Sequence, residues 1–125
     1  MPSLQVIGRK RLFLAGQLVG VEGYVESAAT GMLAGMNAAR LVFGEAPLTP
    51  PRTTALGSLL AYVTQRGKKG FQPMNANYGL FPPLTRALRG RDKKLALAER
   101  ALADLARWRE TVGAGAEPAG RQSVA

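Results

Sequence analysis

Three glycines between an apolar run and a long helical stretch are the residues of this sequence best suited to ligand chemistry. Gly16 ends the apolar run 12–16, and Gly20 and Gly23 follow before a helix expected over 24–43. Glycine lets the backbone approach a flat or charged ligand closely, and a helix N-terminus presents unpaired N–H donors at the positive end of its dipole. The arrangement is typical of a site that binds an anionic group. A tight strand-to-helix turn that binds nothing is the alternative.

The spacing of these glycines and the side chains available elsewhere narrow the chemistry. The pattern G-x-x-x-G-x-x-G differs from the dinucleotide fingerprint G-x-G-x-x-G, and the Lys-Ser/Thr pair of a P-loop is absent. The 125 residues include no cysteine and no histidine. Disulfides, Cys/His zinc sites, cysteine nucleophiles and Ser-His-Asp triads are therefore excluded. We predict no catalytic residue and no metal site. Any catalysis would therefore rely on a cofactor, on a partner, or on the carboxylate, lysine and tyrosine side chains of this chain.

The charge of the chain is strongly basic and unevenly distributed. Lys and Arg number 17 and Asp and Glu number 8, which gives a net charge of +9. Residues 66–125 carry 12 of these basic residues and 5 of the acidic ones. A basic surface attracts phosphates without regard to sequence. The second half of the chain therefore suggests nucleic-acid contact, with a merely solvated basic surface as the alternative.

The first half of the chain must position the glycine turn. The apolar run 12–16 predicts a buried strand of the kind found in parallel sheets. The helix 24–43 follows the turn and is ended by a glycine and a proline. A second amphipathic helix is predicted from a cap at Thr53 or Thr54 to about Gln65.

The second half adds a loop and one more helix. Residues 71–84 combine prolines and asparagines with large apolar groups, which predicts an ordered loop with its aromatic side chains anchored in a core. A third helix is predicted from a cap at Asp92 to about Glu110, with an apolar stripe formed by Leu95, Ala98, Leu102, Leu105 and Trp108. Residues 111–125 are expected to be a disordered tail. The fold class is therefore mostly helical with one or two short strands, in one domain over 1–110.

Three separate segments of this sequence resemble one family. The first reads Leu-Phe-Leu-Ala-Gly-Gln over 12–17 and Gly-Val-Glu-Gly-Tyr-Val-Glu-Ser-Ala-Ala-Thr-Gly over 20–31. The others are Thr-Ala-Leu-Gly at 54–57 and Phe-Gln-Pro-Met-Asn-Ala-Asn-Tyr-Gly-Leu-Phe-Pro-Pro-Leu at 71–84. Together they resemble the C-terminal flavin-binding part of the TrmFO family, the folate- and FAD-dependent tRNA (uracil-5-)-methyltransferases. The related GidA (MnmG) flavoproteins of wobble-uridine modification share the first segment but typically have Thr-Thr in the turn and lack the last one.

The resemblance implies a flavin role for the glycine turn. TrmFO enzymes transfer a one-carbon unit from methylenetetrahydrofolate to a uridine of tRNA, with electrons from FAD that NAD(P)H reduces. By resemblance, Gly16 and Gln17 end a strand of a Rossmann-like FAD-binding domain. The start of the helix 24–43 is expected to point at the pyrimidine edge of the isoalloxazine ring, where reduced flavin carries negative charge. The residues expected near this ring are Gly20, Val21, Glu22, Gly23 and Tyr24.

The resemblance also gives the basic second half a partner, tRNA. Phosphate contacts of this kind position an RNA without reading its sequence. The candidate residues for such contacts are Arg86, Arg89, Arg91, Lys93, Lys94 and Arg100.

Two features of the family are missing from this sequence. The G-x-G-x-x-G segment that holds the FAD pyrophosphate and the catalytic cysteines of the family are both absent. We therefore expect the chain to correspond to the C-terminal part of a longer protein and to be inactive alone. One alternative is a small basic nucleic-acid-binding module, and another is a module that completes a separate N-terminal flavoprotein chain or associates with itself. A GidA-type role in wobble-uridine modification is a further alternative. No apolar run approaches the ~18 residues that span a bilayer, so we expect a cytoplasmic protein without a membrane partner.

Overall fold

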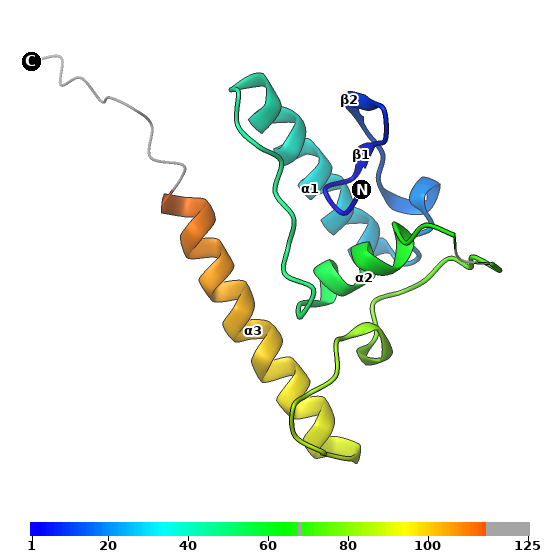
Figure 1. Ribbon diagram of the computed structural model, residues 1–125, viewed down its shortest axis with the longest axis vertical. Helices are drawn as coiled ribbons and strands as arrows, with labels where there is room; N and C mark the ends of the chain where they lie inside the picture. The colour runs from blue at the N-terminus through cyan, green and yellow to red at the C-terminus, as the bar shows by residue number, and fades with distance from the viewer. Residues whose placement is uncertain (68, 115–125) are drawn as a thin grey trace, which may run out of the picture.

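The computed structural model of the protein describes residues 1–67 and 69–114. The strands are β1 (Gln5–Val6) and β2 (Arg9–Phe13), and the helices are α1 (Tyr24–Val42), α2 (Ala55–Val63) and α3 (Gly90–Ala114). Two short 3₁₀ helices complete the fold, η1 (Gly16–Val19) and η2 (Tyr78–Leu80). The expectation of a mostly helical fold with short strands is confirmed (Figure 1). Of the predicted tail, residues 111–114 belong to α3 and 115–125 lie outside the described residues.

The strand predicted over 12–16 is wrong in position, pairing and burial. The observed strand β2 begins at Arg9, pairs antiparallel with β1, and is exposed except at Phe13. Its charged side chains keep it in water, and Gly8 with φ +79° forms the turn back to β1. Gly16, with φ +67°, cannot continue an extended strand and instead begins η1. Within the described residues the only parallel pairing is an isolated bridge, so membership of a Rossmann-like sheet stays a prediction.

The core lies where α1 crosses the hairpin and α2 (Figure 1). Leu4, Leu33 and Leu60 form its buried centre, and partly buried side chains from both 3₁₀ and helical segments pack around them. Of the two predicted caps of α2, Thr54 is the observed one, and its Oγ1 accepts a hydrogen bond from the N–H of Gly57 at 3.1 Å. The helix ends at Val63 and not at Gln65, and its apolar stripe faces this core.

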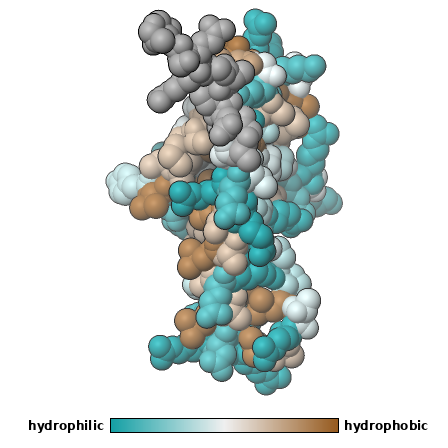
Figure 2. Space-filling view, turned by 90° about the vertical axis from the view of Figure 1, so that its left-hand side faces the viewer, coloured by the Kyte–Doolittle hydropathy of each residue, from teal (hydrophilic) through white to brown (hydrophobic). Residues whose placement is uncertain are grey.

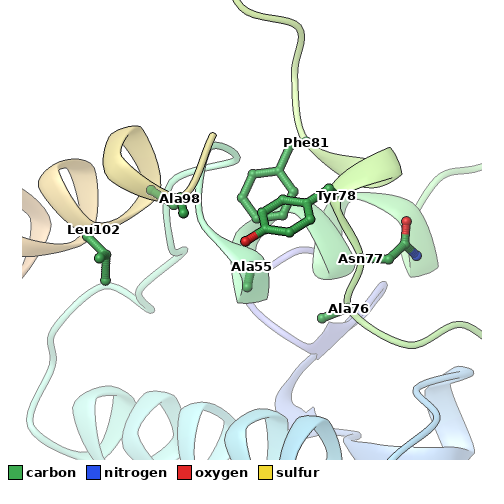
Figure 3. Close-up of a pocket in the computed structure, with 8 residues that line it drawn as sticks. Ala55, Ala76, Asn77, Tyr78, Phe81, Ala98 and Leu102 are labelled. Carbon is green, nitrogen blue, oxygen red and sulfur yellow. The ribbon is translucent and has the colours of Figure 1, made fainter. Parts of the chain in front are cut away.

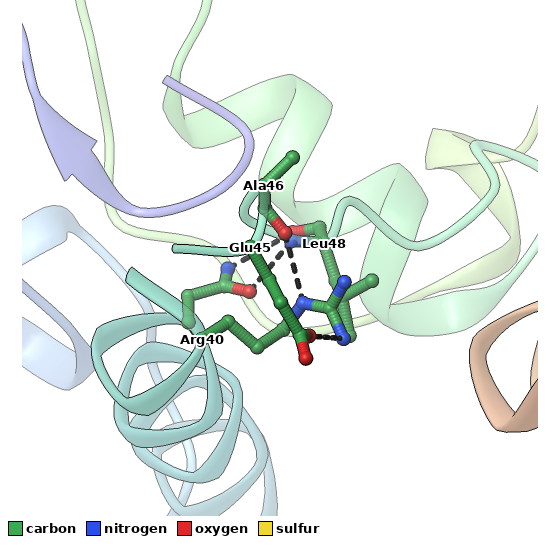
Figure 4. Close-up of polar contacts among 5 residues, drawn as sticks. Arg40, Glu45, Ala46 and Leu48 are labelled. Atoms are coloured by element: carbon green, nitrogen blue, oxygen red, sulfur yellow. Dashed lines mark hydrogen bonds and ion pairs between the residues drawn. The ribbon is translucent and has the colours of Figure 1, made fainter. Parts of the chain in front are cut away.

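Asn37 is fully buried on α1 and joins three parts of the chain. Its Nδ2 donates to the carbonyls of Ser3 and Leu48 at 2.9 Å each, and its Oδ1 accepts from the Leu48 N–H at 2.6 Å. One turn further, Arg40 donates to the carbonyl of Ala46 at 2.8 Å and forms a 2.7 Å ion pair with Glu45 (Figure 4). These contacts fix the connector after α1 and thereby the direction from which α2 enters.

The helix α3 lies apart from the rest of the fold, on the side opposite the hairpin (Figure 1). It begins at Gly90, so Asp92 lies in the first turn and is not the cap that we predicted. The predicted apolar stripe is largely exposed, with 68% of Leu102 accessible, and Leu97 is the buried leucine instead. Figure 2 shows apolar side chains scattered among hydrophilic ones over this face. Among the described residues, no helix has the length and apolarity needed to cross a membrane.

Candidate functional site

All three glycines of the turn adopt a backbone conformation that favours glycine. Their φ angles are +67° at Gly16, +87° at Gly20 and +89° at Gly23. The N–H of Gly20 donates to the carbonyl of Gln17 at 3.0 Å, and that of Val21 donates to the carbonyl of Gly16 at 3.2 Å. The sequence analysis expected glycine here for the close approach of a ligand, whereas the structure shows that the φ angles favour it. The first half of the segment is a 3₁₀ helix and not an open loop.

The loop 71–84, which we call the docked loop, contacts this turn through backbone hydrogen bonds. The N–H of Glu22 donates to the Met74 carbonyl, and the N–H of Met74 donates to the Gly20 carbonyl, both at 3.0 Å. The Phe71 ring lies directly over Gly20, where a Cβ atom would be 2.2 Å from the ring. Val21 is completely buried beneath this contact. Two segments about fifty residues apart in the sequence thus form one structure.

A pocket of about 610 Å³ opens where the turn, the docked loop and the start of α1 meet. We call it the turn pocket, and its lining residues are Gln17, Glu22, Gly23, Tyr24, Ser27 and Asn75. Four of the residues predicted to contact a cofactor are among them. The other three predicted residues do not line the pocket. Val21 is buried, Gly20 is covered by the Phe71 ring, and the N–H of Gly16 donates to Thr30 Oγ1 at 3.1 Å.

The start of α1 forms one wall of the turn pocket and is not capped by a side chain. Its N-cap is Gly23, whose carbonyl accepts from the Ser27 N–H at 3.0 Å. The exposed Tyr24 side chain, which is 97% accessible, leaves the first turn open. N–H groups in the first turn of a helix lack partners within that helix and point along the positive end of the dipole. The wall can therefore donate hydrogen bonds to a polar or anionic ligand edge.

Glu26 holds the two sides of the turn pocket together. Its Oε1 accepts from the N–H of Ala76 at 3.3 Å, and its Oε2 lies 2.2 Å from the place a Cβ of Gly23 would take. The Asn75 amide nitrogen lies 2.8 Å from the same place. No larger residue than glycine fits at position 23 without displacing both side chains.

Sequence reasoning missed two lining residues of the turn pocket, Ser27 and Asn75. Ser27 is four residues after Gly23, so the helix period alone would place both on one face. Asn75 belongs to the segment 71–84, which the sequence marked as unusual, but its approach to the turn is a long-range contact that no local pattern encodes.

The predicted phosphate-binding cations fall into two groups. Five of them are exposed in the connector before α3 and in its first turns: Arg86, Arg89, Arg91, Lys93 and Lys94. Arg100 is half-buried, and its guanidinium donates to the carbonyl of Pro83 at 3.0 Å and to that of Pro82. Arg100 is therefore occupied in tying the end of the docked loop to α3.

One carboxylate on α3, that of Asp104, has a lowered pKa. Thr53 Oγ1 donates to Asp104, and this hydrogen bond, together with the neighbouring charges of Arg107 and Arg100, lowers the pKa of Asp104. Arg107 also donates to the other carboxylate oxygen. This contact joins the middle of α3 to the segment that precedes α2.

Two kinds of comparison with known proteins give matches to this chain. A family model described as "Glucose inhibited division protein A" matches residues 1–46. The chain is also 56% identical over 111 residues to the methylenetetrahydrofolate–tRNA-(uracil-5-)-methyltransferase TrmFO of Geobacter sulfurreducens. This chain is homologous to TrmFO proteins. The alignment covers 89% of this chain and 26% of that relative.

Two further TrmFO relatives show the same coverage. The protein of Pelobacter propionicus is 48% identical over 128 residues, which is 98% of this chain and 28% of its own length. That of Bacillus cereus is 55% identical over 102 residues, which is 81% of this chain and 24% of its own length. The chain thus spans about a quarter of the length of the curated TrmFO relatives it matches. Since the alignments reach well beyond residue 46, the resemblance to TrmFO covers the docked loop and α3, as expected.

Proposed function

We propose that this chain is the C-terminal, flavin-side part of a methylenetetrahydrofolate- and FAD-dependent tRNA (uracil-5-)-methyltransferase of the TrmFO type. In this proposal the turn pocket lies against the isoalloxazine ring. The observation that carries it is the meeting of two family-like segments, 16–24 and 71–77, around one polar pocket at the open start of α1.

The residues of the turn pocket fit a flat ring with hydrogen-bonding edges. The amides of Gln17 and Asn75 and the first-turn N–H groups of α1 can donate to ring carbonyls, and Gly23 keeps the backbone close. The helix dipole stabilises negative charge at this edge by about 0.3–1 kcal/mol for each exposed interaction. When bound, FAD would supply the electron transfer, with NAD(P)H and methylenetetrahydrofolate as substrates. This chain would hold the ring and favour its anionic edge.

The flavin contact is tested by FAD affinity of the full chain and of two glycine variants. In Gly23→Ala the new Cβ would collide with Glu26 and Asn75, so the wall of the turn pocket must shift. Loss of even one hydrogen bond of about 1 kcal/mol predicts FAD binding weakened about five-fold or more. Gly35→Ala is the matched control, because its Cβ on α1 meets nothing within 4 Å. Equal affinities of both variants would contradict the proposed contact.

A second proposal concerns what surrounds this part of the protein. Several large apolar side chains of α1 are exposed, including Val25 at 80%, Met32 at 64% and Val42 at 83%. Such surfaces usually contact another protein segment. We propose that a separate N-terminal flavoprotein chain, or a second copy, covers α1, and that the chain alone does not turn over substrate. Methylation of tRNA by the chain alone with FAD, folate and NAD(P)H would contradict this. Modification of a wobble uridine instead would indicate the GidA-type alternative.

A further inference from the structure

A second pocket, of about 540 Å³, lies between α3 and the aromatic end of the docked loop. We call it the aromatic pocket; its main walls are Ala55, Tyr78, Phe81, Ala98, Ala101 and Leu102. The Tyr78 and Phe81 rings face Ala98 and Leu102 of α3 across it (Figure 3). The loop has aromatic side chains at this pocket and not in the core, which corrects our expectation of buried anchors.

The aromatic wall is held rigidly. The centroids of the Tyr78 and Phe81 rings lie 5.5 Å apart with an angle of 38° between their planes. Asn77 caps η2 by accepting from the Gly79 N–H at 2.9 Å, which fixes the backbone beneath both rings. Arg100 ties the two residues that follow Phe81 to α3. Tyr78 is nevertheless 43% accessible and lines the aromatic pocket.

The opposite wall of the aromatic pocket carries small side chains. Ala98, Ala101 and Ala55 project only methyl groups, which leaves room for a ligand beside the rings.

The segment that follows the aromatic pocket in the sequence carries positive charge. The connector from the rings to α3 and the first turns of α3 present exposed Arg86, Arg89, Arg91, Lys93 and Lys94. Asp92 and Glu99 are the only acidic residues in the same stretch. An aromatic pocket followed by a run of exposed cations matches a nucleic acid with one base turned out of its stack, because bases stack on aromatic rings while cations hold the adjacent phosphates.

We propose that the aromatic pocket binds one unpaired base of an RNA, stacked on Tyr78 and Phe81, with the five cations holding the flanking phosphates. This rests on the proposed function only in taking tRNA as the partner. It adds a base-binding site separate from the turn pocket.

The test uses the full chain and an RNA stem-loop that carries 2-aminopurine at an unpaired loop position. Stacking on an aromatic residue strengthens binding by about five- to hundred-fold per base and quenches this fluorophore. We expect Tyr78→Ala to weaken binding by about five-fold or more, with loss of quenching. Tyr78→Phe should retain both effects. Ala98→Phe, which fills the aromatic pocket from the side of α3, should weaken binding like Tyr78→Ala.

Salt dependence separates the base site from the phosphate contacts. The aromatic variants should leave the slope of log affinity against log salt unchanged, because the number of phosphate contacts stays the same. Unchanged affinity and quenching in Tyr78→Ala and Ala98→Phe would overturn the base pocket but leave the RNA surface standing. No RNA binding by the unmodified chain would overturn the RNA surface and the base pocket together. If these variants change only the self-association of the chain, measured by sedimentation, the aromatic pocket binds a protein segment, and the proposed base site is overturned.

Discussion

The contact of Phe71 with Gly20 gives a prediction whose size follows from the coordinates. In Gly20→Ala the added Cβ would lie 2.2 Å from the Phe71 ring, at a residue with φ +87°. Left-handed backbone costs about 1–2 kcal/mol for a residue with a Cβ. The ring must also leave the turn, and because Phe71 is already 45% exposed this costs only about 1 kcal/mol of burial. Reduced entropy of the unfolded chain returns about 0.4–1 kcal/mol. We therefore expect a net loss of about 2 kcal/mol.

Urea denaturation followed by circular dichroism measures this loss. With a slope of about 2 kcal/mol per molar urea, the midpoint of Gly20→Ala should fall by about 1 M. The control Gly35→Ala should move the other way, by up to about 1 kcal/mol, because alanine is preferred in an open helix position.

A double-mutant cycle identifies the cause of the loss. In a Phe71→Ala background the ring is gone, so Gly20→Ala should cost only the backbone strain, and the coupling should be about 1 kcal/mol. An equal loss in both backgrounds would show that the ring contact is not responsible. An unchanged midpoint in Gly20→Ala alone would refute the reasoning about the turn altogether.

Three further predictions concern the core, the attachment of α3 and the basic surface. Asn37→Ala should destabilise the chain by about 3 kcal/mol in urea, because it leaves the buried carbonyl of Ser3 and the part-buried N–H and carbonyl of Leu48 without this partner. A loss under about 1 kcal/mol would show that water replaces the amide. Because the pKa of Asp104 is lowered in the folded chain, its contribution to stability is complete above the ordinary carboxyl value of 3.8 and disappears as pH falls through the lower native value. Asp104→Asn should therefore flatten the acid limb of a stability–pH curve from pH 6 to 2, and parallel curves would contradict the Thr53 contact. Charge reversal of three exposed cations should weaken tRNA binding and reduce its salt dependence, whereas reversal at Lys10 of the hairpin, on the side away from α3 (Figure 1), should do neither; the three are Arg89, Arg91 and Lys93.

Local sequence patterns were sufficient to predict α1 and the start of α2. The helix α1 was predicted almost to the residue, because Gly44 and Pro47 mark its end, and Thr54 was among two predicted caps for α2. Both signals act within one turn of a helix. The φ angles of the turn glycines were equally local, so the need for glycine at 16, 20 and 23 was visible in the sequence.

The predictions that failed depend on contacts between residues far apart in the sequence. The apolar run at 12–16 suggested a buried strand, but a strand is buried only when partners cover both faces, and here β2 pairs with one short neighbour. The participation of Asn75 in the turn pocket depends on Met74 pairing with Gly20 and Glu22 about fifty residues away. Likewise, Arg100 looked like another surface cation until Pro82 and Pro83 were found beside it.

The short stretch from Asn75 to Tyr78 has a thermodynamic consequence. Asn75 lines the turn pocket, whereas Ala76, Asn77 and Tyr78 line the aromatic pocket, so consecutive residues of one backbone belong to both. Because hydrogen bonds hold this backbone, a displacement that a ligand causes at one pocket also moves residues of the other. We expect the two sites to be linked, and linkage is reciprocal: if RNA raises the affinity for flavin by some factor, flavin must raise the affinity for RNA by the same factor. In this description the stretch is a heterotropic coupler between the two binding equilibria.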